Sequence, residues 1–327
     1  MRAETSPGSA TRARRGPTAS ERLRPSAAWA SACWPCGVLV TPEVRDKDAA
    51  GAAILLAELA AQERNSGRTL VDYLDDIYLR YGYSANRVTS MVMAGAEGSN
   101  HIQKIQATLR QHPPLTIGGL KVIEMIDHQD PGGIHGPILS DTDRVARNVL
   151  VFRLENETRI IVRPSGTEPK NKTYVEVRSA PLGEGADSET LAHTKAAMNA
   201  LAQRVADDFT LQMLAIIGVD LPRYALRISG LVPLDRKIAF GREFLPALET
   251  RALALCRQQT SREEVSKWID ESLWNYGEDA RALVADAVHG YVDVERGRSA
   301  GLSGTEAGER LRCLELISSL FPGATEY

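Results

Sequence analysis

The sequence predicts a mixed α/β (α+β) fold followed by an α-helical C-terminal extension. Two helices are expected before residue 83, and strands between residues 120 and 178 are expected to lie between two further helices. After residue 214, helix caps and apolar periodicity predict helices. We therefore expect four parts: a low-complexity tail (1–36), a partial domain (37–83), an α+β domain (84–214) and the extension (215–327).

Composition limits the classes of function. The 327 residues are 43% hydrophobic and 25% charged, as in an ordinary globular protein. A formal charge of −3 without a basic stripe argues against broad nucleic-acid binding. No apolar run reaches the length of about 18 residues that a membrane span needs, so we expect no membrane partner.

The four cysteines are too few and too scattered for a disulfide framework. Cys33 and Cys36 have the spacing of a redox motif, but no strand is predicted before them and no second pair completes a zinc site. A reducing, cytoplasmic location is therefore expected.

Residues 1–36 are rich in Arg, Ala, Ser and Pro, and their only acidic residues are Glu4 and Glu21. Without apolar periodicity, this segment is predicted to be a disordered tail. An Arg-rich, acid-poor start also resembles an organellar transit peptide, but no clean amphipathic helix accompanies it.

Residues 37–83 should form a short strand and two helices. The strand is expected at residues 38–40 and the first helix at about 49–62, where an almost uniformly apolar surface predicts burial. Thr69 with Asp72 opens the second helix, in an acidic variant of the capping box, and Gly82 ends it.

The α+β domain should begin with a helix capped by Ser99, with Ile102, Ile105 and Leu109 on one face. Strands are expected at residues 120–126, 148–154, 158–162 and 172–178, with a long loop at 128–147 and a turn at 155–157. A final helix is expected at 187–214.

The extension should contain loops or short elements at 215–232 and three later helices. Ser261 with Glu264 caps the first, residues 280–294 form the second, and Ser303 with Glu306 caps the third. Such a module can be an oligomerisation surface or a lid, and the sequence leaves both open.

The motif with the clearest chemistry lies between two predicted strands: Arg163-Pro164-Ser165-Gly166-Thr167-Glu168-Pro169-Lys170-Asn171-Lys172-Thr173-Tyr174. A turn of this kind leaves backbone N–H groups free, and such groups form anion-binding concavities. A guanidinium, an ammonium and two hydroxyl groups add donors for phosphate oxygens. The motif therefore predicts a phosphate site, with an ordinary basic hairpin loop as the alternative.

This motif resembles the phosphate-binding loop in the last domain of the α-D-phosphohexomutases, in the phosphoglucomutase/phosphomannomutase branch. The resemblance implies that the substrate phosphate is held by five residues: Arg163, Ser165, Gly166, Thr167 and Lys172.

The first predicted domain also resembles this family, at the close of its third domain. The similar segments are Arg45-Asp46-Lys47-Asp48, the alanine-rich helix after it, and Leu74-Asp75-Asp76-Ile77-Tyr78. The resemblance, which covers about residues 37–214, implies that Lys47 and Arg45 contact the sugar. The alternative for Arg45-Asp46-Lys47-Asp48 is a charged helix cap.

The family resemblance also implies Mg²⁺ and a phosphoryl-carrying serine, both from the family's N-terminal half, so we expect neither the ligands nor the serine in this chain. Thr18-Ala19-Ser20 is similar to the nucleophile loop, but Glu21-Arg22 follow where the family has His-Asn. Asp141-Thr142-Asp143-Arg144 is similar to a metal loop but has two carboxylates rather than three, and a solvated loop is favoured. Cys33-Trp34-Pro35 stands where the family has its Glu-Glu-Ser sugar motif. We therefore predict no catalytic residue and no metal ligand.

The resulting hypothesis is the C-terminal fragment of a phosphohexomutase, an isomerase for hexose phosphates that is competent only with the missing half supplied. The alternatives are an inactive phosphosugar-binding fragment and a protein that binds a partner, or itself, through the extension. Because a third domain cut midway would expose apolar surface, residues 1–83 are predicted to be poorly packed and 84–214 to fold independently.

Overall fold

The computed structural model describes residues 49–93, 95–166, 168–183, 185–230, 232–299 and 305–321. Contacts group the chain into two compact units: Met1–Tyr81 with Leu182–Gly185, and Gly82–Pro181 with Ala186–Tyr327. The predicted tail (1–36) and the predicted strand at 38–40 lie outside the described residues. The four-part division stays a prediction.

The described part of the first unit contains two helices, α2 (Ala49–Asn65) and α3 (Leu70–Tyr81). The predicted capping of α3 is confirmed: the Asp72 N–H donates to Thr69 Oγ1 (3.2 Å), and the Thr69 N–H donates to the Asp72 carboxylate (2.8 Å). The predicted burial of α2 is wrong. No residue of α2 is buried, and Ile54 is 69% exposed, because a neighbouring helix can cover only one side of a helix that is apolar all round.

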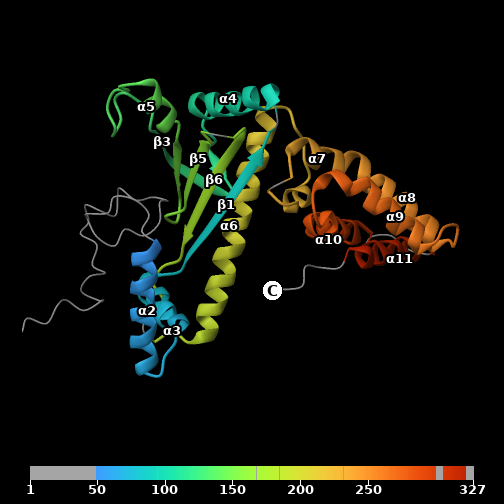
Figure 1. The fold of residues 1–327 in the computed structure, drawn as a ribbon, viewed down its shortest axis with the longest axis horizontal. Coiled ribbons are helices and arrows are strands. Elements are labelled where there is room, and N and C mark those ends of the chain that lie inside the picture. Colours follow the sequence, from blue (N-terminus) through green and yellow to red (C-terminus); the bar gives the residue numbers. More distant parts are fainter. Residues whose placement is uncertain are drawn as a thin grey trace, which may run out of the picture. The chain divides into compact units, whose positions relative to one another are not determined.

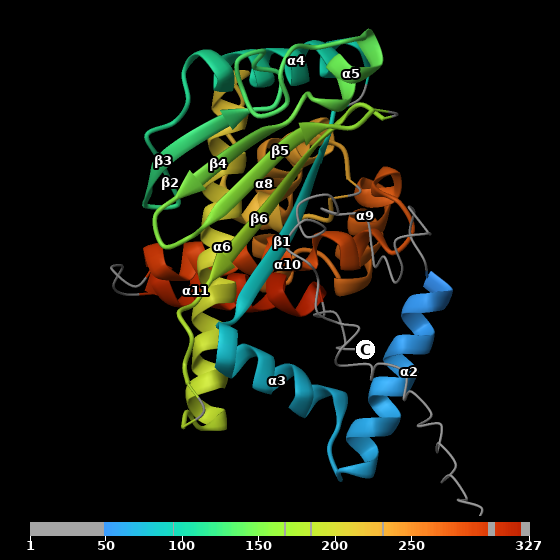
Figure 2. The same ribbon diagram turned by 90° about the vertical axis from the view of Figure 1, so that its left-hand side faces the viewer.

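The second unit is built on a six-stranded antiparallel sheet in the order β1-β6-β5-β4-β3-β2 (Figures 1 and 2). The turn between β4 and β5 has Asn156 and Glu157 at φ of 57° and 55°. Two successive residues with positive φ are the geometry of a tight hairpin turn that matches strand twist, and the predicted turn is confirmed. The strands are β1 (Ser84–Val92), β2 (Thr116–Ile117), β3 (Leu120–Asp127), β4 (Leu150–Leu154), β5 (Arg159–Pro164) and β6 (Lys170–Arg178).

One face of this sheet is covered by α4 (Gly95–Gln111) and by α6 (Ser188–Ile216), which runs along β1 and β6 (Figure 2). The side chains of Phe152 and Phe209, both fully buried, meet edge to face with centroids 5.4 Å apart. Asp187 caps α6 by accepting from the Thr190 N–H (2.8 Å), so the predicted helix is confirmed. We call the opposite face the open face, since no other described helix of this unit packs closely on it. Val88 of β1 is exposed there, whereas Val151 and Ile161 of the central strands are buried.

Three local expectations differ from the structure. β1 is a strand that was not predicted, because its residues show no alternation of apolar and polar types. Helix α4 begins at Gly95, so Ser99 lies inside it and not at its cap. The predicted loop at 128–147 contains the short helix α5 (Asp141–Ala146), capped by Ser140.

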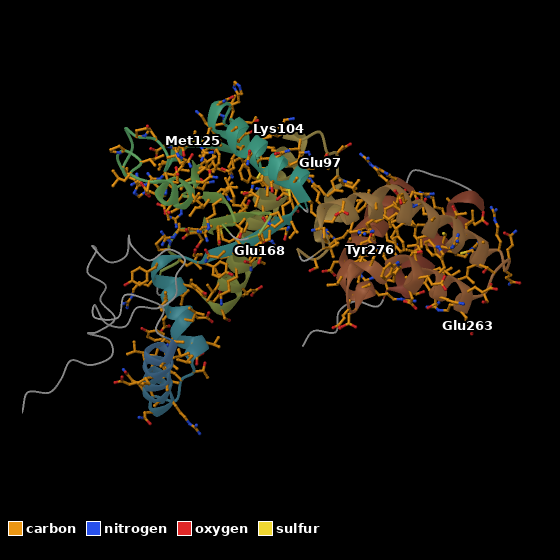
Figure 3. All side chains as sticks on the ribbon, turned by 45° about the horizontal axis from the view of Figure 1, so that its top comes forward. Glu97, Lys104, Met125, Glu168, Glu263 and Tyr276 are labelled. Carbon is orange, nitrogen blue, oxygen red and sulfur yellow. The ribbon has the colours of Figure 1, made fainter. Side chains whose placement is uncertain are left out.

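The extension is helical, as predicted, and belongs to the second unit. The capping box on α9 is confirmed, because Ser261 and Glu264 exchange side-chain and backbone hydrogen bonds. Tyr276, labelled in Figure 3, donates to the Arg236 carbonyl (2.9 Å). The segment 234–256, for which no helix was predicted, is helical throughout. The elements are η1 (Arg223–Arg227), α7 (Leu234–Ala239), η2 (Phe240–Phe244), α8 (Leu245–Cys256), α9 (Arg262–Leu273), η3 (Trp274–Tyr276), α10 (Ala280–Ser299) and α11 (Thr305–Leu320).

None of the helices in the described ranges combines the length and the apolar character that crossing a membrane requires.

Candidate phosphate-binding loop

The register of β5 and β6 places two cationic side chains opposite each other. Arg163 is the cross-strand partner of Lys172, and Pro164 that of Asn171. Directly opposed residues of antiparallel strands point to the same face of a sheet. Because Val162 and Thr173 are buried on the helix-covered face, Arg163 and Lys172 belong to the open face.

The residues between these cations form a tight, anchored loop, which we call the phosphate loop (residues 163–172). The Ser165 N–H donates to the Lys170 carbonyl (2.8 Å), and the Met93 N–H donates to the Pro169 carbonyl (2.9 Å). Gly166 is exposed, and a Cβ atom built on it would meet nothing within 4 Å. The backbone is therefore open to an approaching anion on this side. Thr167 lies outside the described residues.

The phosphate loop has a surplus of positive charge. Glu168, labelled in Figure 3, is ion-paired with Lys170, and this hydrogen-bonded ammonium, assisted by the charge of Lys172, lowers the pKa of the Glu168 carboxyl. Among the residues that the structure describes, neither Arg163 nor Lys172 forms an ion pair. Two unpaired cations on one face, one of them a planar fork of donors, suit a phosphate group.

The segment that contains the phosphate loop is similar in sequence to known proteins. Residues 139–201 match the family profile described as phosphoglucomutase/phosphomannomutase, C-terminal domain. This part of the chain is therefore similar to the C-terminal domain of the phosphohexomutases. A probable phosphomannomutase of Haemophilus influenzae is 40% identical over 144 residues, which are 43% of this chain and 26% of that protein. A phosphoglucomutase of Staphylococcus epidermidis is 37% identical over 141 residues, 42% of this chain and 26% of that protein.

The chain thus spans about a quarter of the length of these phosphohexomutases, in which the match covers 26%. A solved structure, the phosphoglucomutase pp63/parafusin from Paramecium in its open form, aligns with 55% of this chain and 29% of its own, at 15% identity and a TM-score of 0.31.

Behind the phosphate loop lies a buried amide pair that sequence reasoning missed. Asn171, 2% exposed, accepts from Gln106 Nε2 of α4 (3.4 Å) and directs its own Nδ2 toward the Met213 sulfur (3.5 Å). The Gln106 Oε1 is buried without a partner. The alternation of β6 could have indicated this pair, because it places the polar Asn171 at a core position. The pair ties the base of the phosphate loop to both covering helices.

The residues that were compared with the family's metal loop have a structural role. Asp143 lies in the first turn of α5, where its carboxylate accepts from the Leu139 N–H (3.0 Å) and from Arg147 Nε (2.6 Å). The backbone hydrogen bond, followed by Arg147, lowers the pKa of Asp143. The expected solvated loop is thus a capped helix start.

Among the described residues, no three His, Cys, Asp or Glu side chains are grouped so that they could hold a metal ion. The remaining candidates of the sequence analysis, Arg45, Lys47, Ser20, Cys33 and Cys36, lie outside the described residues.

Proposed function

We propose that the phosphate loop binds the phosphate group of a hexose phosphate, as the C-terminal part of a phosphoglucomutase- or phosphomannomutase-type isomerase. The observation that carries this proposal is the cross-strand pair of Arg163 and Lys172, which has no carboxylate partner in the described part of the chain. The guanidinium can hold two phosphate oxygens at once, and the ammonium adds charge from the neighbouring strand. Ser165 and Thr167 complete the proposed site with hydroxyl donors.

The proposed contribution is binding of the substrate rather than transfer of its phosphoryl group. A site that binds the phosphate equally well in the ground and transition states gives affinity without turnover. Phosphoryl transfer also requires a positioned donor or acceptor and neutralisation of developing charge. Our proposal leaves these roles, and Mg²⁺, to the family's other domains, and it includes sugar contacts from Arg45 and Lys47.

Two further elements belong to this proposal. The location we infer is cytoplasmic, which suits the free thiols of Cys256 and Cys313.

A protein partner is the second candidate, because α2 and α3 of the first unit expose the apolar side chains of Ile54, Leu56 and Val71.

The test is equilibrium binding of glucose 6-phosphate to the full chain by calorimetry, with glucose as the uncharged reference. Arg163→Ala should weaken binding of the phosphosugar by about 1.5–3 kcal/mol, the scale for hydrogen bonds to charged groups. The matched control is Arg153→Ala on β4, since Arg153 is exposed and paired with Glu124 (3.2 Å) at a distance from the phosphate loop. Equal affinity in the Arg163 variant and the wild type would refute the phosphate-loop assignment.

A mutase assay then separates binding from turnover. The purified chain is supplied with glucose 1-phosphate, Mg²⁺ and a trace of glucose 1,6-bisphosphate, and glucose 6-phosphate is measured. Binding without turnover is the expected result and supports a phosphosugar-binding part of a mutase. Turnover would contradict the statement that this chain contributes binding alone.

A further inference from the structure

A second site candidate lies on the helix-covered face of the sheet. A cavity of about 630 Å³ is bounded by β1 and α6 on one side and by residues from 221–230, 232–237 and α10 of the extension on the other. Both sides belong to the same compact unit. The volume is in the range of small-molecule pockets, about 300–1,000 Å³. No described residue of the phosphate loop except the buried Asn171 lines it, so this cavity is distinct from the open-face site.

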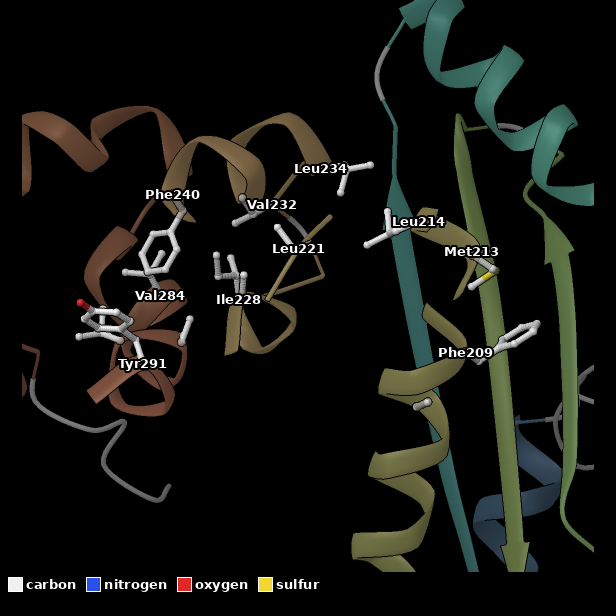
Figure 4. Close-up of a cluster of buried hydrophobic side chains, with 14 of the residues drawn as sticks. Phe209, Met213, Leu214, Leu221, Ile228, Val232, Leu234, Phe240, Val284 and Tyr291 are labelled. Atoms are coloured by element: carbon white, nitrogen blue, oxygen red, sulfur yellow. The ribbon is translucent and has the colours of Figure 1, made fainter. Parts of the chain in front are cut away.

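Much of the cavity wall is apolar. Figure 4 shows Met213 and Leu214 of α6 on one side and side chains of the extension on the other. All six of the following lining residues are buried, so a ligand with an apolar body would be transferred out of water on binding. They are Met213, Leu214, Leu221, Ile228, Val232 and Leu234.

Lys237 of α7 supplies a cation with spare donors. Its Nζ donates one hydrogen bond, to the Ile228 carbonyl (2.9 Å), whereas an ammonium has three donors. Burial lowers the pKa of Lys237 to about 8, so in most molecules the side chain still carries its proton at pH 7. Within the described ranges it has no carboxylate partner. A half-buried ammonium of this kind is stabilised by an anion.

The other charged lining groups favour an anion as well. Arg87 of β1 and Arg227 of η1 line the cavity. Neither forms an ion pair within the described ranges, but the positive charges of both act to lower the pKa of the lining carboxylate Asp207. Of the two lining carboxylates, Asp207 is partly buried, and this desolvation raises its pKa despite a hydrogen bond from Gln203 Nε2 (2.6 Å). The second, Asp286, is exposed. The cavity wall therefore has more cations than carboxylates, although the formal charge of the whole chain is −3.

We propose that this cavity binds a small organic anion with an apolar body, whose carboxylate, sulfonate or phosphate group is held by Lys237 together with Arg87 and Arg227. The apolar wall covers the body of the ligand, and the three cations orient its charged end. The extension supplies Lys237 and Arg227, and β1 supplies Arg87. This site does not depend on the phosphate loop, and it stands if the proposed function fails.

The probe is 8-anilino-1-naphthalenesulfonate, an aromatic sulfonate that fluoresces more strongly in apolar surroundings. It is titrated into the full chain, and calorimetry gives the stoichiometry; one molecule per chain should bind at the strongest site. Lys237→Met removes the ammonium and keeps the length of the side chain. We expect it to weaken this binding by about ten- to a hundredfold, the range for a lost charged hydrogen bond.

Three other variants make the test specific. Lys267→Met is the matched control, because the side chain of Lys267 on α9 is 79% exposed, and it should bind the probe like the wild type. Asp286→Asn removes a carboxylate from the wall at an exposed position, so it should strengthen binding severalfold. Arg163→Ala should leave the affinity for the probe unchanged.

The proposal is overturned by any of three results: no saturable strong site, equal affinity in the Lys237 variant and the wild type, or loss of the probe in the Arg163 variant. Circular dichroism shows whether each variant is folded. If Lys237→Met does not fold, the affinity of Asp286→Asn for the probe becomes the test. A weakened or unchanged affinity in that variant contradicts an anion site.

Discussion

The substitution Gly98→Ala should have two opposing effects on the stability of α4. A Cβ atom at Gly98 would lie 2.1 Å from the Met93 carbonyl oxygen and 2.8 Å from the Met93 Cβ. Met93 has little room to move, because it is buried and its N–H donates to the Pro169 carbonyl (2.9 Å). The start of α4 must therefore shift, and forced overpacking of this kind costs about 1–3 kcal/mol.

Helix propensity acts in the other direction, since alanine stabilises a helix interior by about 1 kcal/mol relative to glycine. With a backbone clash this close, we take the upper part of the overpacking range and expect a net loss of about 2 kcal/mol. In a unit of this size that lowers the melting temperature by about 4–8 °C.

The assay is thermal and urea unfolding of the full chain, followed by circular dichroism. The control is Gly297→Ala in α10, where an added Cβ meets nothing within 4 Å, so propensity alone should stabilise the protein by up to about 1 kcal/mol. If Gly98→Ala were as stable as the wild type or more stable, the close approach of α4 to Met93 would not be real.

Three further predictions concern stability. Phe209→Ala, which removes the ring packed on Phe152, should cost about 3–5 kcal/mol in urea unfolding; a loss below 1 kcal/mol would contradict the packing of α6 on the sheet. Ser261→Ala should cost about 1 kcal/mol through its capping box with Glu264, and no change would mean that α9 starts elsewhere. The pKa of Lys237 is about 8 in the folded chain and 10.5 in the unfolded chain. Between these pH values the unfolded chain binds more protons, so the stability of the wild type relative to Lys237→Met should rise from pH 8 to 10.5. A fall would contradict the burial of Lys237.

Much of the fold could be predicted because it is encoded locally. The capping box at Ser261 and the cap at Asp187 each depend on residues three positions apart. Strands β4, β5 and β6 could be predicted from their apolar residues and from the turn signals between them. The phosphate loop was found by its motif, and the structure adds the register that places Arg163 opposite Lys172.

The features that were missed depend on contacts between distant segments. β1 is a strand because it pairs with β6 and not because of its own composition, with Ala85 as its one fully buried residue. The start of α4 is an exception, because Gly98 lies close to Met93 only five residues earlier, a contact that no cap residue signals. The low pKa of Lys237 results from burial in the folded chain, which no local pattern of the sequence signals.

Strand β6 contributes to both proposed sites. Lys172 points to the open face, whereas Asn171 and Thr173 point into the cavity face, because successive residues of a strand alternate. A shared element couples two ligands when it has two positions and each ligand binds these positions with different affinities. β6 is hydrogen-bonded to β1 and β5 on its two sides, and Asn171 is fixed by Gln106, so we expect one position.

Saturating glucose 6-phosphate should therefore change the affinity for 8-anilino-1-naphthalenesulfonate by less than about twofold. The measurement is a fluorescence titration with and without the phosphosugar, with glucose as the control for added sugar. A larger change that disappears in the Arg163→Ala variant would show that β6 moves between two positions. The central strands of the sheet would then connect the two sites, and the rigid description of the sheet would be wrong.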